Sequence, residues 1–142
     1  MARKSRKMWK VDFQSHNVQL QVPVEKAYAF LRDLNNLQKL MPEQVINWES
    51  TEESCSFDIK GMAHISLERA ETIPGKLIRI ISRPENPIDL EIRGNFEKTG
   101  ADQTIAWIVL TADLSPMLKL LASGPMQNLV NIMADRLRAA RI

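Results

Sequence analysis

The sequence predicts an α+β fold in which one curved antiparallel sheet of seven strands wraps a long C-terminal helix. Three observations support this: a strand and a helix open the chain, six strand-like segments follow without a break, and a helical segment closes it. The turns between the six segments are short, and parallel neighbours would need crossovers of about a dozen residues or more. The closing helix is the only predicted element large enough to cover one face of the sheet.

The first strand and the first helix are distinguished by the spacing of their apolar residues. Val18, Leu20 and Val22 alternate with polar residues, which is typical of a half-buried strand, and Pro23 ends it. The following segment has apolar residues every three or four positions and is predicted to be a helix that ends before Pro42. Its apolar face consists of Ala27, Phe30, Leu31, Leu34 and Leu37.

The middle of the chain alternates between strand-like segments and turn residues. The breaks contain glycine, proline or runs of polar residues. Alternation is clearest at Ile88, Leu90 and Ile92, which are separated by charged residues. The predicted strands cover residues 44–50, 54–60, 62–71, 76–83, 87–98 and 103–113.

The last segment has a clear helix start. Ser115 is a suitable N-cap and Pro116 suits the first helical position. We expect a kink or a restart at residues 123–125, where Gly124 and Pro125 interrupt the pattern. Beyond them an apolar stripe is formed by Met126, Leu129, Val130, Met133 and Leu137.

Net charge divides the chain of 142 residues into two parts. Residues 1–10 contain five basic residues (Arg3, Lys4, Arg6, Lys7 and Lys10) and no acidic one, so residues 11–142 carry 14 basic and 17 acidic residues. We therefore expect a flexible basic arm at 1–10 and a single, slightly acidic domain at 11–142. This distribution argues against a specific nucleic-acid-binding face on the domain.

Several kinds of site are not predicted. The lone Cys55 cannot form an internal disulfide, and His16 and His64 lack the spacing of a metal site. The five glycines follow no phosphate-binding or dinucleotide-binding pattern, so no cofactor is expected. His64 is expected on the outer face of its strand, with a general-base role as the minor alternative. No membrane span or signal peptide is indicated, and the expected compartment is the cytoplasm.

Three joints of the sequence resemble those of the START and birch-pollen-allergen (SRPBCC) superfamily, which has the helix-grip fold. They are the opening strand and helix at residues 22–31, the helix exit at residues 33–42, and the junction of last strand and last helix at residues 112–118. The similarity extends over residues 18–140 and is closest to small single-domain bacterial members. Such members are often labelled polyketide cyclases by fold analogy, which does not establish an activity.

The inward positions of such a fold are predicted to be almost entirely apolar. We therefore favour a non-catalytic protein that carries or senses a small hydrophobic ligand, such as a lipid or a polyketide-like molecule, between the sheet and the last helix. Residues 124–125 would act as a hinge that admits the ligand. The predicted lining residues are Met41, Phe57, Ile59, Ala63, Ile65, Leu67, Leu90, Ile92, Ile108, Leu110, Met126, Leu129, Val130 and Met133.

Two alternatives remain open. The first is a cyclase-like or dehydratase-like enzyme, which requires an inward polar group. An inward Arg79 could contact the headgroup of a ligand. We nevertheless expect Arg79 to point outward, because burying an unpaired charge is costly. An interaction module with a filled core is the other alternative. The last strand is apolar on both sides, so Ile105, Trp107 and Val109 could form a contact in a homodimer.

Overall fold

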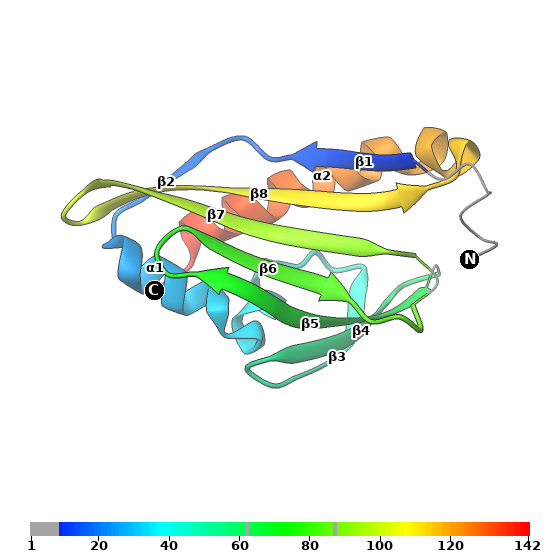
Figure 1. Ribbon diagram of the computed structural model, residues 1–142, viewed down its shortest axis with the longest axis horizontal. Coiled ribbons are helices and arrows are strands. Elements are labelled where there is room, and N and C mark those ends of the chain that lie inside the picture. The colour runs from blue at the N-terminus through cyan, green and yellow to red at the C-terminus, as the bar shows by residue number, and fades with distance from the viewer. Residues whose placement is uncertain (1–8, 62, 87) are drawn as a thin grey trace.

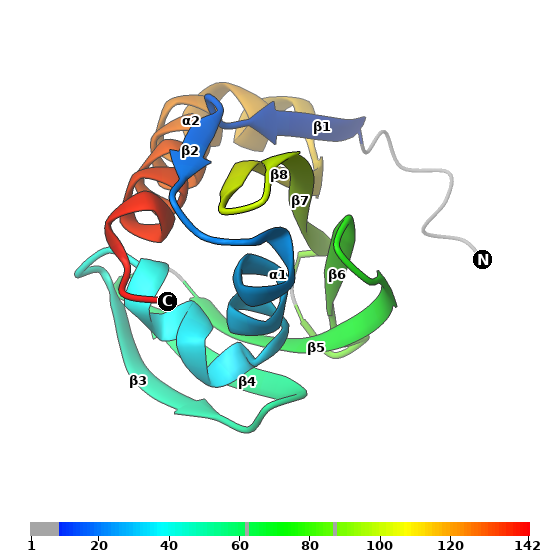
Figure 2. The ribbon, with the colours of Figure 1, turned by 90° about the vertical axis from the view of Figure 1, so that its left-hand side faces the viewer.

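The computed structural model describes residues 9–61, 63–86 and 88–142 and confirms the predicted α+β architecture (Figure 1). One antiparallel sheet curves around the helices, as the view along its length shows (Figure 2). The elements in chain order are β1 (Trp9–Gln14), β2 (Val18–Leu20), α1 (Val24–Arg32), the 3₁₀ helix η2 (Leu34–Leu40), β3 (Val45–Ser50), β4 (Ser54–Ile59), β5 (Ala63–Ile73), β6 (Leu77–Ser82), β7 (Leu90–Gly100), β8 (Gln103–Leu114) and α2 (Pro116–Ala139).

The sheet has eight strands where seven were predicted, because β1 precedes the predicted first strand, which corresponds to β2, and also pairs with β8. The spatial order is β1-β8-β7-β6-β5-β4-β3, and β2 also pairs with β8. Between β1 and β2, the Ser15 N–H donates to the carbonyl of Ile108 at 2.8 Å, and the Ile108 N–H donates to Oγ of Ser15 at 2.9 Å. This serine side chain lets the chain bend while the hydrogen bonding to β8 continues.

β1 begins within the segment that the sequence assigned to the basic arm. Trp9 pairs with Leu114, and Lys10 pairs with Asp113. The rest of the predicted arm, residues 1–8, lies outside the described residues.

The predicted first helix is two shorter helices. α1 ends at Arg32, and Asp33 caps η2 by accepting a hydrogen bond from the N–H of Asn35 at 3.0 Å. Leu34, Leu37 and Leu40 are fully buried. Their spacing of three residues suits a 3₁₀ helix, in which every third side chain lies on the same side.

α1 packs tightly against the concave side of β7. A Cβ atom at Gly94 would lie only 2.3 Å from Cδ2 of Leu31, so the approach requires a residue without a side chain. Beside this contact, the rings of Tyr28 and Phe96 meet edge to face with centroids 6.3 Å apart. The sheet is therefore closed by α1 at one end, on the left of Figure 1.

α2 is one continuous helix, so the predicted restart at residues 123–125 does not occur. Pro125 lies inside the helix and cannot donate a backbone hydrogen bond. The Ser123 hydroxyl donates to the carbonyl of Lys119, one turn earlier. The C-terminal part of α2 is anchored near η2, where the Arg136 guanidinium donates to the carbonyl of Met41.

Candidate functional site

The residues predicted to line a ligand site all belong to the apolar core or pack against it. One group is buried: Met41, Phe57, Ile65, Leu67, Ile92, Ile108, Leu110, Val130 and Met133. The second group is only partly buried: Ile59, Ala63, Leu90, Met126 and Leu129.

On β4, β5 and β7 the two groups are separated along the strand. We define the distal end as the end far from α1, where the β4–β5 and β6–β7 turns and the start of α2 lie, on the right of Figure 1. In β4, Phe57 is buried but Ile59, at the distal end, is not; β7 shows the same difference between Ile92 and Leu90. On β4 and β7 the apolar interior is thus closed near α1 and reached by solvent toward the distal end, whereas on β8 the inward Ala112 and Leu114 stay buried up to that end.

Arg79 projects from the outer face of β6. Its neighbours in the strand, Ile78 and Ile80, are fully buried on the opposite face. The Arg79 guanidinium donates to both carboxylate oxygens of Glu91, at 3.1 and 3.0 Å, and to Glu71. These hydrogen bonds from Arg79 are the main reason why the pKa of Glu91 is lowered.

Both histidines lie at the surface beside aspartates. His64 Nδ1 is 2.6 Å from Oδ1 of Asp58 on the neighbouring strand. Hydrogen bonds from Asn47, and then from His64, lower the pKa of Asp58. His16 Nε2 is 2.7 Å from Oδ1 of Asp135, so this pair links the β1–β2 connection to α2.

Cys55 lies inside the core, on the same face of β4 as Phe57. Burial raises the pKa of its thiol to about 12, against a smaller lowering by Arg83. A thiol with this pKa stays protonated at neutral pH, when it is a poor nucleophile. Cys55 therefore acts as a small apolar residue.

The outer face of β8 is apolar but partly covered. Val109 is buried, whereas Ile105 and Trp107 are half-buried. The Asn95 side chain on β7 contacts the backbone carbonyl of Trp107 at 3.4 Å. The contact with a second copy predicted for these residues stays a prediction.

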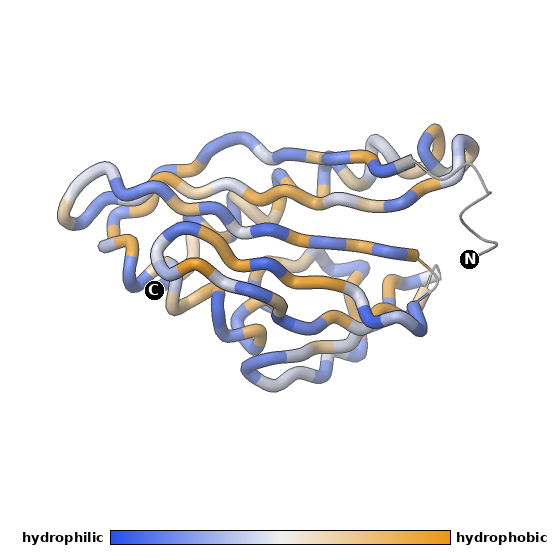
Figure 3. Tube along the Cα trace, in the orientation of Figure 1, coloured by the Kyte–Doolittle hydropathy of each residue, from blue (hydrophilic) through white to orange (hydrophobic). Residues whose placement is uncertain are grey.

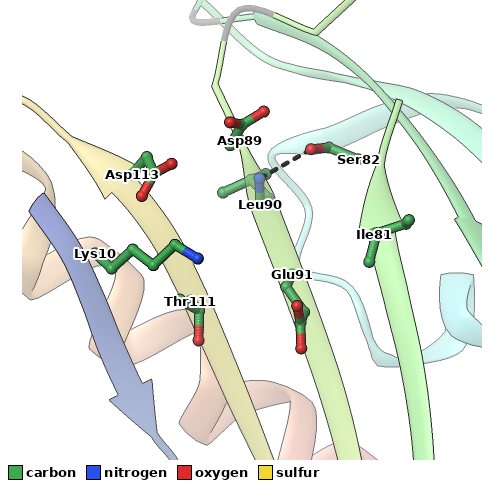
Figure 4. A pocket seen from close by; sticks show the side chains of 8 residues that line it. All are labelled: Lys10, Ile81, Ser82, Asp89, Leu90, Glu91, Thr111 and Asp113. Atoms are coloured by element: carbon green, nitrogen blue, oxygen red, sulfur yellow. Dashed lines mark hydrogen bonds between the residues drawn. The ribbon is translucent and has the colours of Figure 1, made fainter. Parts of the chain in front are cut away.

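A polar pocket of about 220 Å³ lies where β1, β8, β7 and β6 approach the distal end (Figure 4). Lys10 extends across β8 toward β7, among three carboxylates. The Leu90 N–H donates to Oγ of Ser82 at 2.9 Å. Sequence reasoning missed this pocket because only the strand register brings its residues together. They are Lys10, Ile81, Ser82, Asp89, Leu90, Glu91, Thr111 and Asp113.

Two further polar pockets, of about 280 and 630 Å³, are both lined by Thr51, Ser54 and Arg83. In the larger pocket, the Arg69 guanidinium donates hydrogen bonds to the backbone carbonyls of Arg32 and Glu52, at 2.7 and 2.9 Å.

The described residues contain no cluster of three or more side chains suited to a metal ion. Among those same residues, no helix has the length and hydropathy needed to cross a bilayer.

Comparison with known proteins identifies the fold and nothing narrower. No protein-family model matches the chain, and no curated protein sequence gives a significant match. A solved structure from Thermus thermophilus is similar with a TM-score of 0.70 and 20% identity, covering 91% of this chain and 95% of that one. Norcoclaurine synthase from Thalictrum flavum is similar with a TM-score of 0.70 and 9% identity, covering 93% and 86%.

A further structure of norcoclaurine synthase, in complex with dopamine and hydroxybenzaldehyde, is similar with a TM-score of 0.64 and 7% identity, covering 95% of this chain and 90% of that one. Identities this low carry no conclusion about activity. The strand order, the long closing helix and these similarities together establish that the chain has a helix-grip fold of the birch-pollen-allergen type.

Proposed function

We propose that the protein binds a small apolar molecule, of lipid or polyketide-like character, between the concave side of the sheet and α2, without catalysing a reaction. The observation that carries this proposal is the decrease in burial of the inward apolar side chains of β4, β5 and β7 toward the distal end. A core that only stabilised the fold would gain from burying Leu90, Met126 and Leu129 completely, but they are left partly exposed. On the three joints that resemble the superfamily, we also infer that the chain is one of its small bacterial members.

The chemistry of the interior favours an uncharged ligand. In the described part of the chain, the buried polar or charged residues are Ser15 and Thr104. The Thr104 hydroxyl donates to the carbonyl of Val22 at 2.9 Å, and Ser15 is bonded to β8. A ligand would therefore be held by burial of its apolar surface, which contributes about 25 cal/mol per Å² before ordering costs.

Entry would require movement of the first half of α2. Pro125 removes one hydrogen bond from the middle of this helix, and Gly124 has no neighbouring atom within 4 Å of the position of a Cβ. We infer that these two residues form the hinge. The structure of norcoclaurine synthase in complex with dopamine and hydroxybenzaldehyde supports the idea that such a fold can hold small molecules.

Two observations favour binding over catalysis. Arg79 and His64, the polar groups that an enzyme of this fold could have used, lie on the outer face in pairs with carboxylates. Cys55 faces the interior, but its raised pKa keeps it protonated. The described interior thus offers no charged side chain as a general acid or base.

Binding can be tested with one pair of variants on neighbouring residues. Ala63→Phe adds a large side chain to the partly buried interior, whereas His64→Phe adds the same ring to the opposite, exposed face of β5. We expect N-phenylnaphthylamine, an apolar fluorescent probe, to bind the wild-type protein and the His64 variant equally. We expect at least about tenfold weaker binding to the Ala63 variant, because the added ring fills space that the probe would occupy.

Two results would contradict the proposal. Equal probe affinity in the Ala63 and His64 variants would place the probe elsewhere. Absence of probe binding, together with native mass spectra and organic extracts without a co-purified ligand, would favour the interaction module with a filled core. Circular dichroism of both variants confirms that they are folded.

A further inference from the structure

A basic pocket of about 400 Å³ lies where the end of α2 meets η2. Its lining consists of Lys39 from η2, Arg136 and Arg141 from the end of the chain, and the small side chains of Ala139 and Ala140. Figure 2 shows the end of α2, in red, beside η2, in cyan. In Figure 3 the chain end marked C lies on the left, so this basic pocket is far from the distal end on the right.

The charged groups around the basic pocket are all positive. Among the described residues, no carboxylate lines it, and Lys39, Arg136 and Arg141 take part in none of the salt bridges. The nearest acidic residue in the sequence, Asp135, is paired with His16. The backbone carbonyls at the end of a helix carry only about half a negative charge. Three full positive charges therefore dominate the electrostatic potential of the pocket.

Two of the three cations are held in position by the fold. The Arg136 guanidinium donates to the backbone carbonyl of Met41, and its remaining N–H groups are available to a ligand. The Lys39 ammonium donates to Oδ1 of Asn36 at 3.0 Å and lies 5.5 Å from the centre of the Phe30 ring. Donors that are already positioned lose less entropy when a ligand binds. The helix dipole favours cations at the end of α2, but it does not account for a cation from η2 on the same pocket.

We propose that the basic pocket binds the phosphoryl group of a small molecule, such as a phosphate ester or a diphosphate. A guanidinium matches two phosphate oxygens with parallel hydrogen bonds, and an ammonium adds a compact positive charge. The volume lies within the range of about 300–1,000 Å³ that is typical of small-molecule sites. The two alanines leave space between the cations for the ligand. This site lies outside the apolar interior and does not depend on the binding of an apolar molecule there.

The arrangement of charge favours a phosphoryl group over two other anions. A single carboxylate has one negative charge and two oxygens, so it would leave part of the positive charge of the pocket uncompensated. A nucleic acid binds along an extended basic surface. The domain of residues 11–142 carries 14 basic and 17 acidic residues, and these three cations are gathered around one pocket.

Isothermal titration calorimetry with inorganic pyrophosphate tests the proposal on the full-length protein. We expect saturable binding at a single site, and weaker binding at high salt because exposed charges are screened. Lys39→Gln combined with Arg141→Gln removes two cations of the lining and leaves the bond from Arg136 to Met41 in place. This variant should bind pyrophosphate at least about tenfold more weakly, because it loses two hydrogen-bonding partners that carry charge.

The matched control is Arg138→Gln combined with Lys26→Gln, which removes two exposed cations that do not line the pocket. Its net charge equals that of the test variant, and its affinity should stay within about twofold of the wild type. Circular dichroism checks that both variants are folded. The proposal is overturned if the wild type shows no saturable binding, if the Lys39 and Arg141 variant binds as tightly as the wild type, or if both variants lose affinity equally. Loss of N-phenylnaphthylamine binding would contradict only the proposed apolar site.

Discussion

Replacing Gly94 with alanine tests how α1 closes one end of the sheet. The added Cβ would lie 2.3 Å from Cδ2 of Leu31, and Leu31 has little room to move because it is only 2% exposed. Inserting a methyl group into a well-packed core costs about 1–3 kcal/mol. For a chain of 142 residues, the unfolding entropy is about 0.3 kcal/mol per kelvin, so Tm should fall by about 3–10 °C.

Gly124→Ala is the matched control, because no atom lies within 4 Å of the added Cβ in α2. Alanine stabilises a helix interior relative to glycine by about 0.5–1 kcal/mol, so this variant should raise Tm by about 2–3 °C. Both Tm values can be measured by circular dichroism or calorimetry. In a double-mutant cycle, Leu31→Ala should relieve part of the loss caused by Gly94→Ala. A wild-type Tm for Gly94→Ala, or strict additivity with Leu31→Ala, would refute the described packing of α1 on β7.

Three further predictions concern single groups. Native Cys55 should resist a thiol reagent at pH 8 and should react once the protein is unfolded. Folding raises the pKa of its thiol from 9.0 to about 12, so the contribution of Cys55 to stability is complete below pH 9 and is lost as pH rises toward 12. In urea titrations at alkaline pH, Cys55→Ala should reduce this loss. The pKa of Glu91 is lowered by folding, so its contribution to stability is present at neutral pH and is lost as the pH falls. The stability difference between wild type and Arg79→Gln should therefore be largest near pH 7 and shrink as acid protonates Glu91. Equal differences at neutral and acidic pH would contradict this. Thr104→Val should lower the free energy of unfolding by about 1–3 kcal/mol, because the buried hydroxyl no longer satisfies the carbonyl of Val22, and an unchanged urea midpoint would count against that bond.

The pattern of apolar residues was sufficient to predict the fold class, the six strands from residue 44 onward and the inward face of most strands. These features depend on neighbouring positions along one strand or helix, as the buried Ile92 and the exposed-face Glu91 illustrate. The additional strand β1 was not predicted in this way. It is defined by its pairing with β8, which is distant in sequence, and Ser15 continues that pairing through its bonds to Ile108.

The partners of charged groups were also decided only by the tertiary structure. Arg79 is surrounded by apolar residues in the sequence, and the strand register alone places Glu91 beside it and brings Lys10 into its polar pocket. A local pattern contains no information about which strand lies alongside, because register is set by long-range packing.

The sequence by itself determined that α2 would be an apolar helix closing one curved antiparallel sheet. Only the tertiary structure decided which face of that helix is covered. Val130 and Met133 are buried, and so is Ala122 near the start of the helix, whereas the equally apolar Leu120 and Leu121 lie on another face and are exposed. The physical reason is that burial depends on what lies opposite a side chain, and which face of α2 meets the sheet is a property of the assembled fold.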